Sequence, residues 1–313
     1  MPLVRSVVNE AVQDPVQKVS GELAPVGLLS EKFGGNFLAC YSMKDIGADG
    51  GPVVQVTNGS GSALNFTAAE LVNTNLELTT HVGEGNDGYV SIWYDQSGNG
   101  RHATQTTTDN MPLIMDAGVY TQGIKSPHGT ALADKRHMDV PFNGSQFTSN
   151  KIGMMVAGKD FNQGENSFGV LFGNTRGVQT YSGSTIAISV NGNTISLRNE
   201  HLTNAAQSAG NLVSLSHRTG ITNVGFTLNG DTPYVFWDNN HEFDSDAPGD
   251  FGATPDFDST INFKFFMSSL SNAADYWLRA ADGTISEAYI FEGDTIDSIQ
   301  QIISDINIKY SIN

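Results

Sequence analysis

Residues 88–105 read GYVSIWYDQSGNGRHATQ and carry the clearest structural signal in the chain. The first half, Tyr89–Asp95, has large residues at successive positions, which is typical of a strand buried on both faces in the middle of a sandwich. The second half consists of glycines, which adopt backbone angles that other residues avoid, and of short polar residues that hydrogen-bond neighbouring backbone. These turn formers are Asp95, Ser97, Gly98, Asn99 and Gly100. The segment therefore predicts a core strand that ends in a sharp polar turn.

Two dipeptides, Asn191-Gly192 and Asn229-Gly230, predict β-hairpins farther along the chain. Asn-Gly accepts positive φ at both positions of a two-residue turn, so it is a strong hairpin signal when strand-like segments flank it. Alternation of apolar and polar residues in Ile261–Met267, and the apolar run Ile285–Phe291, predict two further strands. The strands expected to flank the two turns are Thr185–Val190 with Asn193–Arg198, and Val224–Leu228 with Tyr234–Trp237.

One helix is predicted, over residues 295–310. Its isoleucines recur at steps of three and four, which places them on one face. Asp294 and Asp297 stand at its N-terminal end, where carboxylates satisfy free N–H groups and favour the helix dipole. We expect this helix to close one edge or face of the sandwich. The isoleucines are Ile296, Ile299, Ile303 and Ile306.

Composition limits the partners of the chain. Its net charge of −17, from 16 basic and 33 acidic side chains, repels phosphate backbones and anionic lipid heads. No segment approaches the roughly 20 apolar residues that a membrane-spanning helix needs. We therefore expect neither nucleic acid as a partner nor insertion into a membrane. The single cysteine, Cys40, excludes an intramolecular disulfide.

A family resemblance follows from the segments at the two ends of this pattern. Gly88–Gln105, followed by Pro112, resembles a signature of concanavalin A-like lectin/glucanase modules in phage structural and bacterial surface proteins. A similar YDQSG run occurs in arabinofuranosidase catalytic domains. Gly283–Tyr310 is similar to the ending of laminin-G-like modules. The resemblance implies an all-β fold: a two-sheet antiparallel jelly-roll sandwich over residues 31–313, with an extended N-terminal arm and one C-terminal helix. This fold hosts lectins, hydrolases and inert structural modules alike.

Residues 1–30 are interpreted as an arm that precedes the sandwich. Prolines punctuate the arm and its valines follow no long period, so it is either a loosely packed terminus or an anchor that orders against a partner. The start of the arm resembles that of phage proteins that carry this module. The resemblance implies a virion surface protein (head decoration, head fibre or tail fibre) that is attached to other virion proteins through residues 1–30. The attachment residues would be Val4, Val7, Val8, Val12 and Val16.

Further expectations concern location and partners. The apolar residues near the N-terminus are interrupted by charged and polar ones, so no signal-peptide core is predicted, and the protein would be made in the host cytoplasm and reside in the virion. A homo-oligomer such as a trimer and a host-surface glycan are the other partners expected for this reading. The acidic surface suits an exposed protein present in many copies.

The candidate site residues fall into two groups. Asp95, Asn99 and His102 are either structural turn residues or a ligand or cation site, and Trp237 at the end of a hairpin strand is either core or a stacking platform for a sugar. The second group lies in an acidic region, where carboxylates either ligate calcium or form a solvated loop. Apart from calcium in this loop, no cofactor is expected. Its ligands would be Asp244, Asp246, Asp256 and Asp258.

The sequence favours a protein that is not an enzyme. The alternative is a glycoside hydrolase of the arabinofuranosidase type acting on polysaccharide, which would use two carboxylates about 5–5.5 Å apart. Glu287 matches a glutamate in the family ending, but the same residue recurs in modules without catalytic activity, so it is interpreted as structural.

Overall fold

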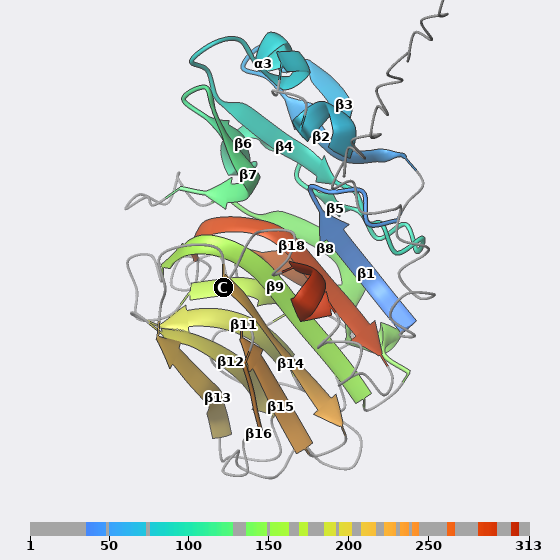
Figure 1. The fold of residues 1–313 in the computed structure, drawn as a ribbon, viewed down its shortest axis with the longest axis vertical. Helices are drawn as coiled ribbons and strands as arrows, with labels where there is room; N and C mark the ends of the chain where they lie inside the picture. The colour runs from blue at the N-terminus through green and yellow to red at the C-terminus, as the bar shows by residue number, and fades with distance from the viewer. Residues whose placement is uncertain are drawn as a thin grey trace, which may run out of the picture.

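The computed structural model describes residues 36–47, 50–72, 76–127, 136–148, 151–162, 169–174, 185–191, 194–201, 208–216, 222–229, 232–237, 240–243, 262–266, 281–292 and 302–306. Strands dominate this part of the chain (Figure 1). They are β1 (Asn36–Ser42), β2 (Pro52–Thr57), β3 (Ala63–Thr67), β4 (Gly88–Trp93), β5 (Ala103–Thr104), β6 (Leu113–Asp116), β7 (Val119–Ser126), β8 (Met138–Asn143), β9 (Lys151–Asn162), β10 (Gly169–Gly173), β11 (Thr185–Asn191), β12 (Thr194–His201), β13 (Ser208–Ser216), β14 (Thr222–Asn229), β15 (Thr232–Trp237), β16 (Asn240–Phe243), β17 (Asn262–Phe265) and β18 (Asp282–Glu292). The helical elements are α2 (Ala68–Val72), α3 (Leu76–Val82), the 3-10 turns η1 (Thr108–Asn110) and η3 (Gly144–Gln146), and residues 302–306.

All strand pairs are antiparallel, which confirms the expected all-β class. One run of neighbours is β1-β18-β9-β14-β15-β16, and a second is β3-β2-β4-β5-β8-β17-β10-β11-β12-β13. Strands β6 and β7 connect β4 to β18 and so join the two runs. The strands therefore form one curled sheet, and the expected jelly-roll of two separate sheets is not confirmed.

Both predicted hairpins are present, but each connection is shifted by one residue. Asn191 pairs with Thr194 between β11 and β12, and Asn229 pairs with Thr232 between β14 and β15. Each asparagine is therefore the last paired residue of its strand rather than the first turn residue. The two-residue connections are residues 192–193 and 230–231, which lie outside the described part of the chain.

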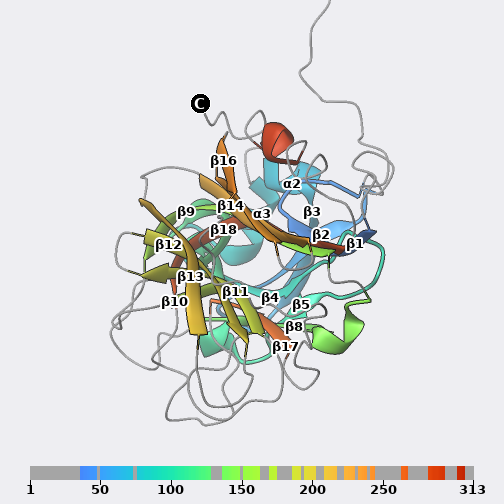
Figure 2. The same cartoon turned by 90° about the horizontal axis from the view of Figure 1, so that it is seen from below.

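Strand β18 is buried on both faces and separates two apolar layers. Ala288 and its cross-strand partners Tyr41 and Val156 belong to the large cluster between the two runs. Tyr289 and its partner Cys40 belong to a smaller cluster on the other face. Residues 302–306 cover this smaller cluster with buried Ile302, Ile303 and Ile306. Figure 2 shows this helix on the side of β18 that is away from β8 and β17.

The predicted C-terminal helix is confirmed where the structure describes it, at residues 302–306, and the rest of 295–310 lies outside the described residues. The same holds for residues 1–30 and the five valines of the expected attachment arm. Helices α2 and α3 were not predicted from the sequence. A local signal for α2 exists, because Glu70 accepts hydrogen bonds from the backbone N–H and the hydroxyl of Thr67, as in a capping box. Among the described residues, no helix is long and apolar enough to cross a membrane.

Candidate functional site

The polar turn after β4 lies along the edge of β1 that does not pair with β18. The carboxylate of Asp95 accepts hydrogen bonds from the backbone N–H of Cys40, Ser97 and Arg101, each at 2.9 Å, and from the hydroxyl of Ser97. One of these donors belongs to β1 and the others to the turn itself. The buried side chain of Asp95 therefore folds the turn and fastens it to the strand.

Other side chains of the turn complete this edge. Gln96 donates from its backbone N–H to the carbonyl of Cys40 and from its side chain to the carbonyl of Ser42. Asn99 donates to the carbonyls of Phe37 and Leu38, at 2.9 and 3.3 Å. The turn thus takes the place of a neighbouring strand, which protects an edge that would otherwise expose unpaired backbone groups. Glycine is required here because Gly98 and Gly100 have φ of +86° and +68°.

The structure thus brings Asp95, Asn99 and His102 together, but it gives them different surroundings. Asp95 and Asn99 hydrogen-bond to backbone groups of the chain and to the hydroxyl of Ser97, and a ligand or cation site at these two residues stays a prediction. His102 is partly exposed, and its Nδ1 accepts a hydrogen bond from the backbone N–H of Asp95 at 3.0 Å. Because Nδ1 is the acceptor, the ring proton is on Nε2.

A row of directly paired residues crosses the face of the second run that points away from the core. Directly opposite residues of an antiparallel pair lie on the same face. The burial pattern fixes which face this is, because Phe263 and Phe265 of β17 are buried whereas Lys264 between them is partly exposed. We call this set the polar row. From β3 to β17 it consists of Asn65, Gln55, Ile92, Thr104, Asp139 and Lys264.

Asp139 and Lys264 form an ion pair at one end of the polar row. The side chain of Asp139 is 47% exposed and that of Lys264 is 16% exposed, so solvent reaches the carboxylate. The row therefore presents an accessible carboxylate beside an ammonium group. The alternation predicted for Ile261–Met267 placed Lys264 on the polar side of its strand, but no sequence pattern indicated its pairing with Asp139.

At the other end of the row, amide side chains form a fixed network. The hydroxyl of Ser91 donates to Gln55 Oε1 at 3.0 Å, and Gln55 Nε2 donates to Asn65 Oδ1 at 3.0 Å. The hydroxyl of Tyr94 donates to the same Asn65 Oδ1, also at 3.0 Å. Burial raises the pKa of Tyr94 and outweighs the lowering by this hydrogen bond, so the hydroxyl remains a donor at neutral pH.

The outer face of the other run, which contains β1 and β18, differs from the polar row because it is mostly apolar. Glu287 is fully buried there, where it pairs in register with Ser42 and accepts hydrogen bonds from the hydroxyls of Ser42, at 3.1 Å, and Tyr289. Apolar residues and the helix at 302–306 cover this side of the strand. The position of Glu287 fits a structural role, as the sequence indicated.

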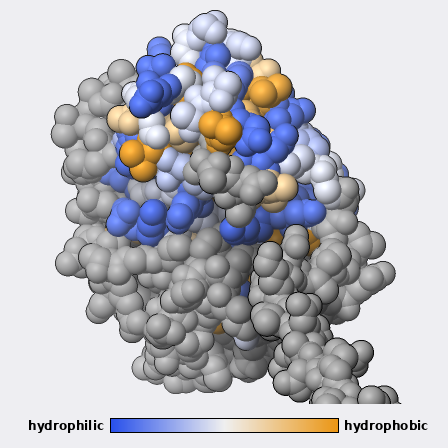
Figure 3. All heavy atoms as spheres, turned by 45° about the horizontal axis from the view of Figure 1, so that its top comes forward, coloured by the Kyte–Doolittle hydropathy of each residue, from blue (hydrophilic) through white to orange (hydrophobic). Residues whose placement is uncertain are grey.

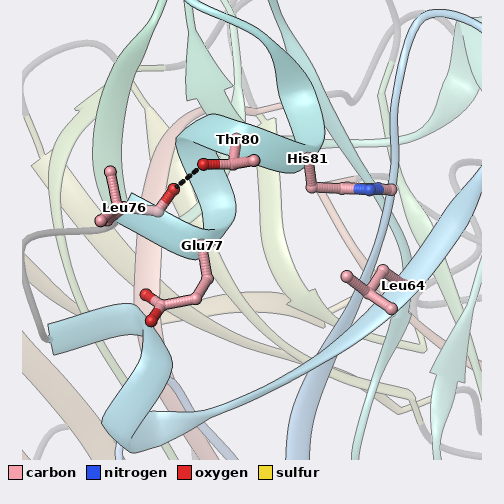
Figure 4. Close-up of a pocket in the computed structure, with 5 residues that line it drawn as sticks. All are labelled: Leu64, Leu76, Glu77, Thr80 and His81. Atoms are coloured by element: carbon pink, nitrogen blue, oxygen red, sulfur yellow. Dashed lines mark hydrogen bonds between the residues drawn. The ribbon is translucent and has the colours of Figure 1, made fainter.

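A separate pocket of about 380 Å³ lies between β3 and α3 (Figure 4). Its lining residues are Leu64, Leu76, Glu77, Thr80 and His81. His81 is held in place because its Nε2 donates to the carbonyl of Val56 at 3.0 Å. Leu64 and Leu76 are 49% and 64% exposed. Figure 3, which brings this end of the molecule forward, shows its hydrophobic surface as separate patches among hydrophilic residues.

The remaining residues expected at a site are Trp237 and the four aspartates of the acidic region. Trp237 ends β15, where it pairs with Val224 and Asn240. The expected calcium ligands Asp244, Asp246, Asp256 and Asp258 lie outside the described residues, so calcium stays a prediction. No cluster of His, Cys, Asp and Glu suited to a metal occurs among the residues that the structure does describe.

The fold is similar to that of solved arabinofuranosidase structures. A GH54 α-L-arabinofuranosidase soaked with a cyclic sulfate inhibitor matches with a TM-score of 0.60 and 15% identity. A mutant GH54 enzyme soaked with 4-nitrophenyl α-L-arabinofuranoside matches equally well. An arabinofuranosidase complexed with arabinofuranosyl-alpha-1,2-xylobiose matches with a TM-score of 0.54, also at 15% identity. The matches cover 90%, 90% and 88% of this chain, which spans 64% of the length of each of these structures. No protein-family model and no curated protein matches the chain.

These comparisons correct two expectations. The expectation that the chain is not an enzyme is wrong. It rested on interpreting the family glutamate, Glu287, as structural, whereas glycoside hydrolases share this fold over nine-tenths of the chain. The resemblance is confirmed only as a likeness to carbohydrate-active β-proteins. The phage module in particular, and with it the role on a virion surface, has no support from these structures.

Proposed function

We propose that the chain is a glycoside hydrolase that acts on a polysaccharide with arabinofuranosyl units and holds it along the polar row. The observation that carries the proposal is the likeness of nearly the whole chain to arabinofuranosidases, one of them bound to an arabinofuranosyl xylobiose. A virion surface role has no comparable observation behind it.

The difference between the two outer faces supports the polar row as the place of contact. One face is filled by apolar side chains and by the helix at 302–306. The polar row offers hydroxyl, amide and charged groups that are partly or fully exposed, as recognition of a polyhydroxylated chain requires. Because the row crosses six strands, a linear glycan could contact it over several sugar units.

Asp139 is the carboxylate that the row contributes to the chemistry. Glycosidic bonds are cleaved by two carboxyl groups, about 5–5.5 Å apart when configuration is retained and about 6.5–9.5 Å apart when it is inverted. One carboxyl group protonates the leaving oxygen while the other attacks the sugar or activates water. We assign Asp139 to one of these two roles on the basis of its exposure and its place in the row.

The test uses the purified full chain with two substrates. We expect release of 4-nitrophenol from 4-nitrophenyl α-L-arabinofuranoside and of arabinose from arabinoxylan, but no sugar from xylan that lacks arabinose. Folding is verified by circular dichroism. A folded protein that releases nothing from either arabinosylated substrate would overturn the proposal.

A further inference from the structure

The ring of Tyr94 lies across the sheet instead of pointing away from it. Its backbone N–H donates to Val53 at the start of β2, and its hydroxyl reaches Asn65 on β3, the strand beyond. A side chain that joins positions two strands apart must run along the surface of the strand between them, because neighbouring strands are about 4.8 Å apart. Tyr94 is partly exposed, so part of its ring is accessible to a ligand.

Two hydrogen-bond donors flank this ring. Asn65 is exposed, and its Oδ1 receives hydrogen bonds from both Gln55 and Tyr94, which directs its Nδ2 away from them. His102 and Tyr94 form a T-shaped ring pair with centroids 5.0 Å apart, and His102 carries its proton on Nε2. Neither Asn65 Nδ2 nor His102 Nε2 makes a hydrogen bond with any part of the chain that the structure describes.

We propose that Tyr94, Asn65 and His102 form a subsite for one neutral sugar unit, an inference that rests on the proposed hydrolase function. The accessible part of the Tyr94 ring would pack on the C–H face of the sugar. The N–H groups of Asn65 and His102 would donate to its hydroxyl or ring oxygens.

The chemistry of the group selects this ligand. The side chains of the network (Ser91, Gln55, Asn65 and Tyr94) are uncharged, so a charged ligand would gain no ion pair from them. The available groups at Asn65 and His102 are donors, which match the ether and hydroxyl oxygens of a saccharide. Both donors are already oriented by other hydrogen bonds, so little ordering opposes binding. Asp139 lies farther along the same row, which makes this subsite one for a unit away from the bond that is cleaved.

The experiment measures retardation of the full chain by soluble arabinoxylan in affinity gel electrophoresis. The variants are Tyr94→Ala, which removes the ring, and Asn65→Asp, which replaces the donor by an acceptor at an exposed site. Val119→Ala, at a residue that is 68% exposed and outside the polar row, is the control. Thermal melting identifies any variant that loses its fold.

We expect Asn65→Asp and Tyr94→Ala each to weaken binding about tenfold or more, while Val119→Ala binds as the wild type does. Wild-type binding that neither substitution weakens would overturn the subsite, and the hydrolase proposal would stand on its own assay. Absence of both binding and hydrolysis in the wild type would overturn both proposals. If Tyr94→Ala does not fold, Asn65→Asp decides the matter, because its side chain lies at the surface.

Discussion

The carboxylate of Asp95 accepts a hydrogen bond from the backbone N–H of Cys40, 55 residues earlier in the chain, at 2.9 Å. This contact belongs to a set in which the DQSGNGR turn does for β1 what a neighbouring strand would do. It gives a physical reason for the clustering of short polar residues and glycines after β4. The motif is therefore evidence for the fold, and evidence for an activity has to come from other residues.

Replacing Asp95 by asparagine should destabilise the fold by about 1–3 kcal/mol. An asparagine has one acceptor oxygen and an NH₂ group, so the second oxygen's two donors, the Ser97 hydroxyl and the Arg101 N–H, lose their acceptor near a buried site. Chemical denaturation at neutral pH measures the change. Asp109→Asn, at an exposed aspartate, is the control and should change stability by less than about 0.5 kcal/mol. Equal stabilities of the two variants would contradict the role of the turn.

The close contact of β9 with β18 predicts a sharp difference between two glycines. A Cβ at Gly158 would lie 2.1 Å from the backbone oxygen of Thr284, whereas at Gly59 it would meet nothing within 4 Å. Gly158→Ala must therefore push two central strands apart, and we expect a loss of about 1–3 kcal/mol or failure to fold. Gly59→Ala should change stability by less than about 0.5 kcal/mol. Melting temperatures of the two variants test this, and a Gly158→Ala protein as stable as Gly59→Ala would refute it.

Local patterns predicted several of the strands, because the signal of each lies within a few residues. Strand β17 has the predicted alternation around Lys264, and β18 contains the apolar run Ile285–Phe291. The two predicted hairpins correspond to β11 with β12 and to β14 with β15. Helix α2 was missed because its five residues are too short for a visible period, although Thr67 and Glu70 mark its start.

The candidate site could not be predicted in the same way, because it depends on pairing between distant segments. Asp139 and Lys264 are 125 residues apart, and Tyr94 reaches Asn65 across an intervening strand. The sequence singled out His102 for its place in the motif, whereas its available nitrogen follows from a hydrogen bond that only the fold reveals. Asn65 and Tyr94 would have needed a known strand order to be recognised together.

Stability should fall as the pH rises above about 9. Burial raises the pKa of the Cys40 thiol well above its ordinary 9.0, and burial likewise raises the pKa of Tyr41 above 10.0. The folded protein thus keeps protons that the unfolded chain releases, so each group's contribution is complete below its unfolded pKa and is lost as the pH rises. The loss reaches at most about 1.4 kcal/mol per pH unit for each group.

Urea denaturation between pH 7 and 11 measures this dependence. In Cys40→Ala, the decline in the free energy of unfolding should begin near pH 10 instead of pH 9, because the thiol no longer contributes. An unchanged onset in this variant would show that another group causes the decline.

Asp139→Asn should separate catalysis from stability. The substitution breaks the ion pair with Lys264, but partly exposed ion pairs contribute only about 0–1 kcal/mol, so the fold should be nearly unaffected. If Asp139 is one of the two catalytic carboxyl groups, release of 4-nitrophenol should fall by about 100-fold or more. The matched control is Asp116→Asn, which breaks a second partly exposed ion pair, that of Asp116 with Lys125 at 2.5 Å, away from the polar row. We expect Asp116→Asn to keep wild-type activity and to lose similar stability. Equal activities of the two variants would show that Asp139 is not a catalytic residue. The two catalytic carboxyl groups of the proposed hydrolase would then belong to other residues.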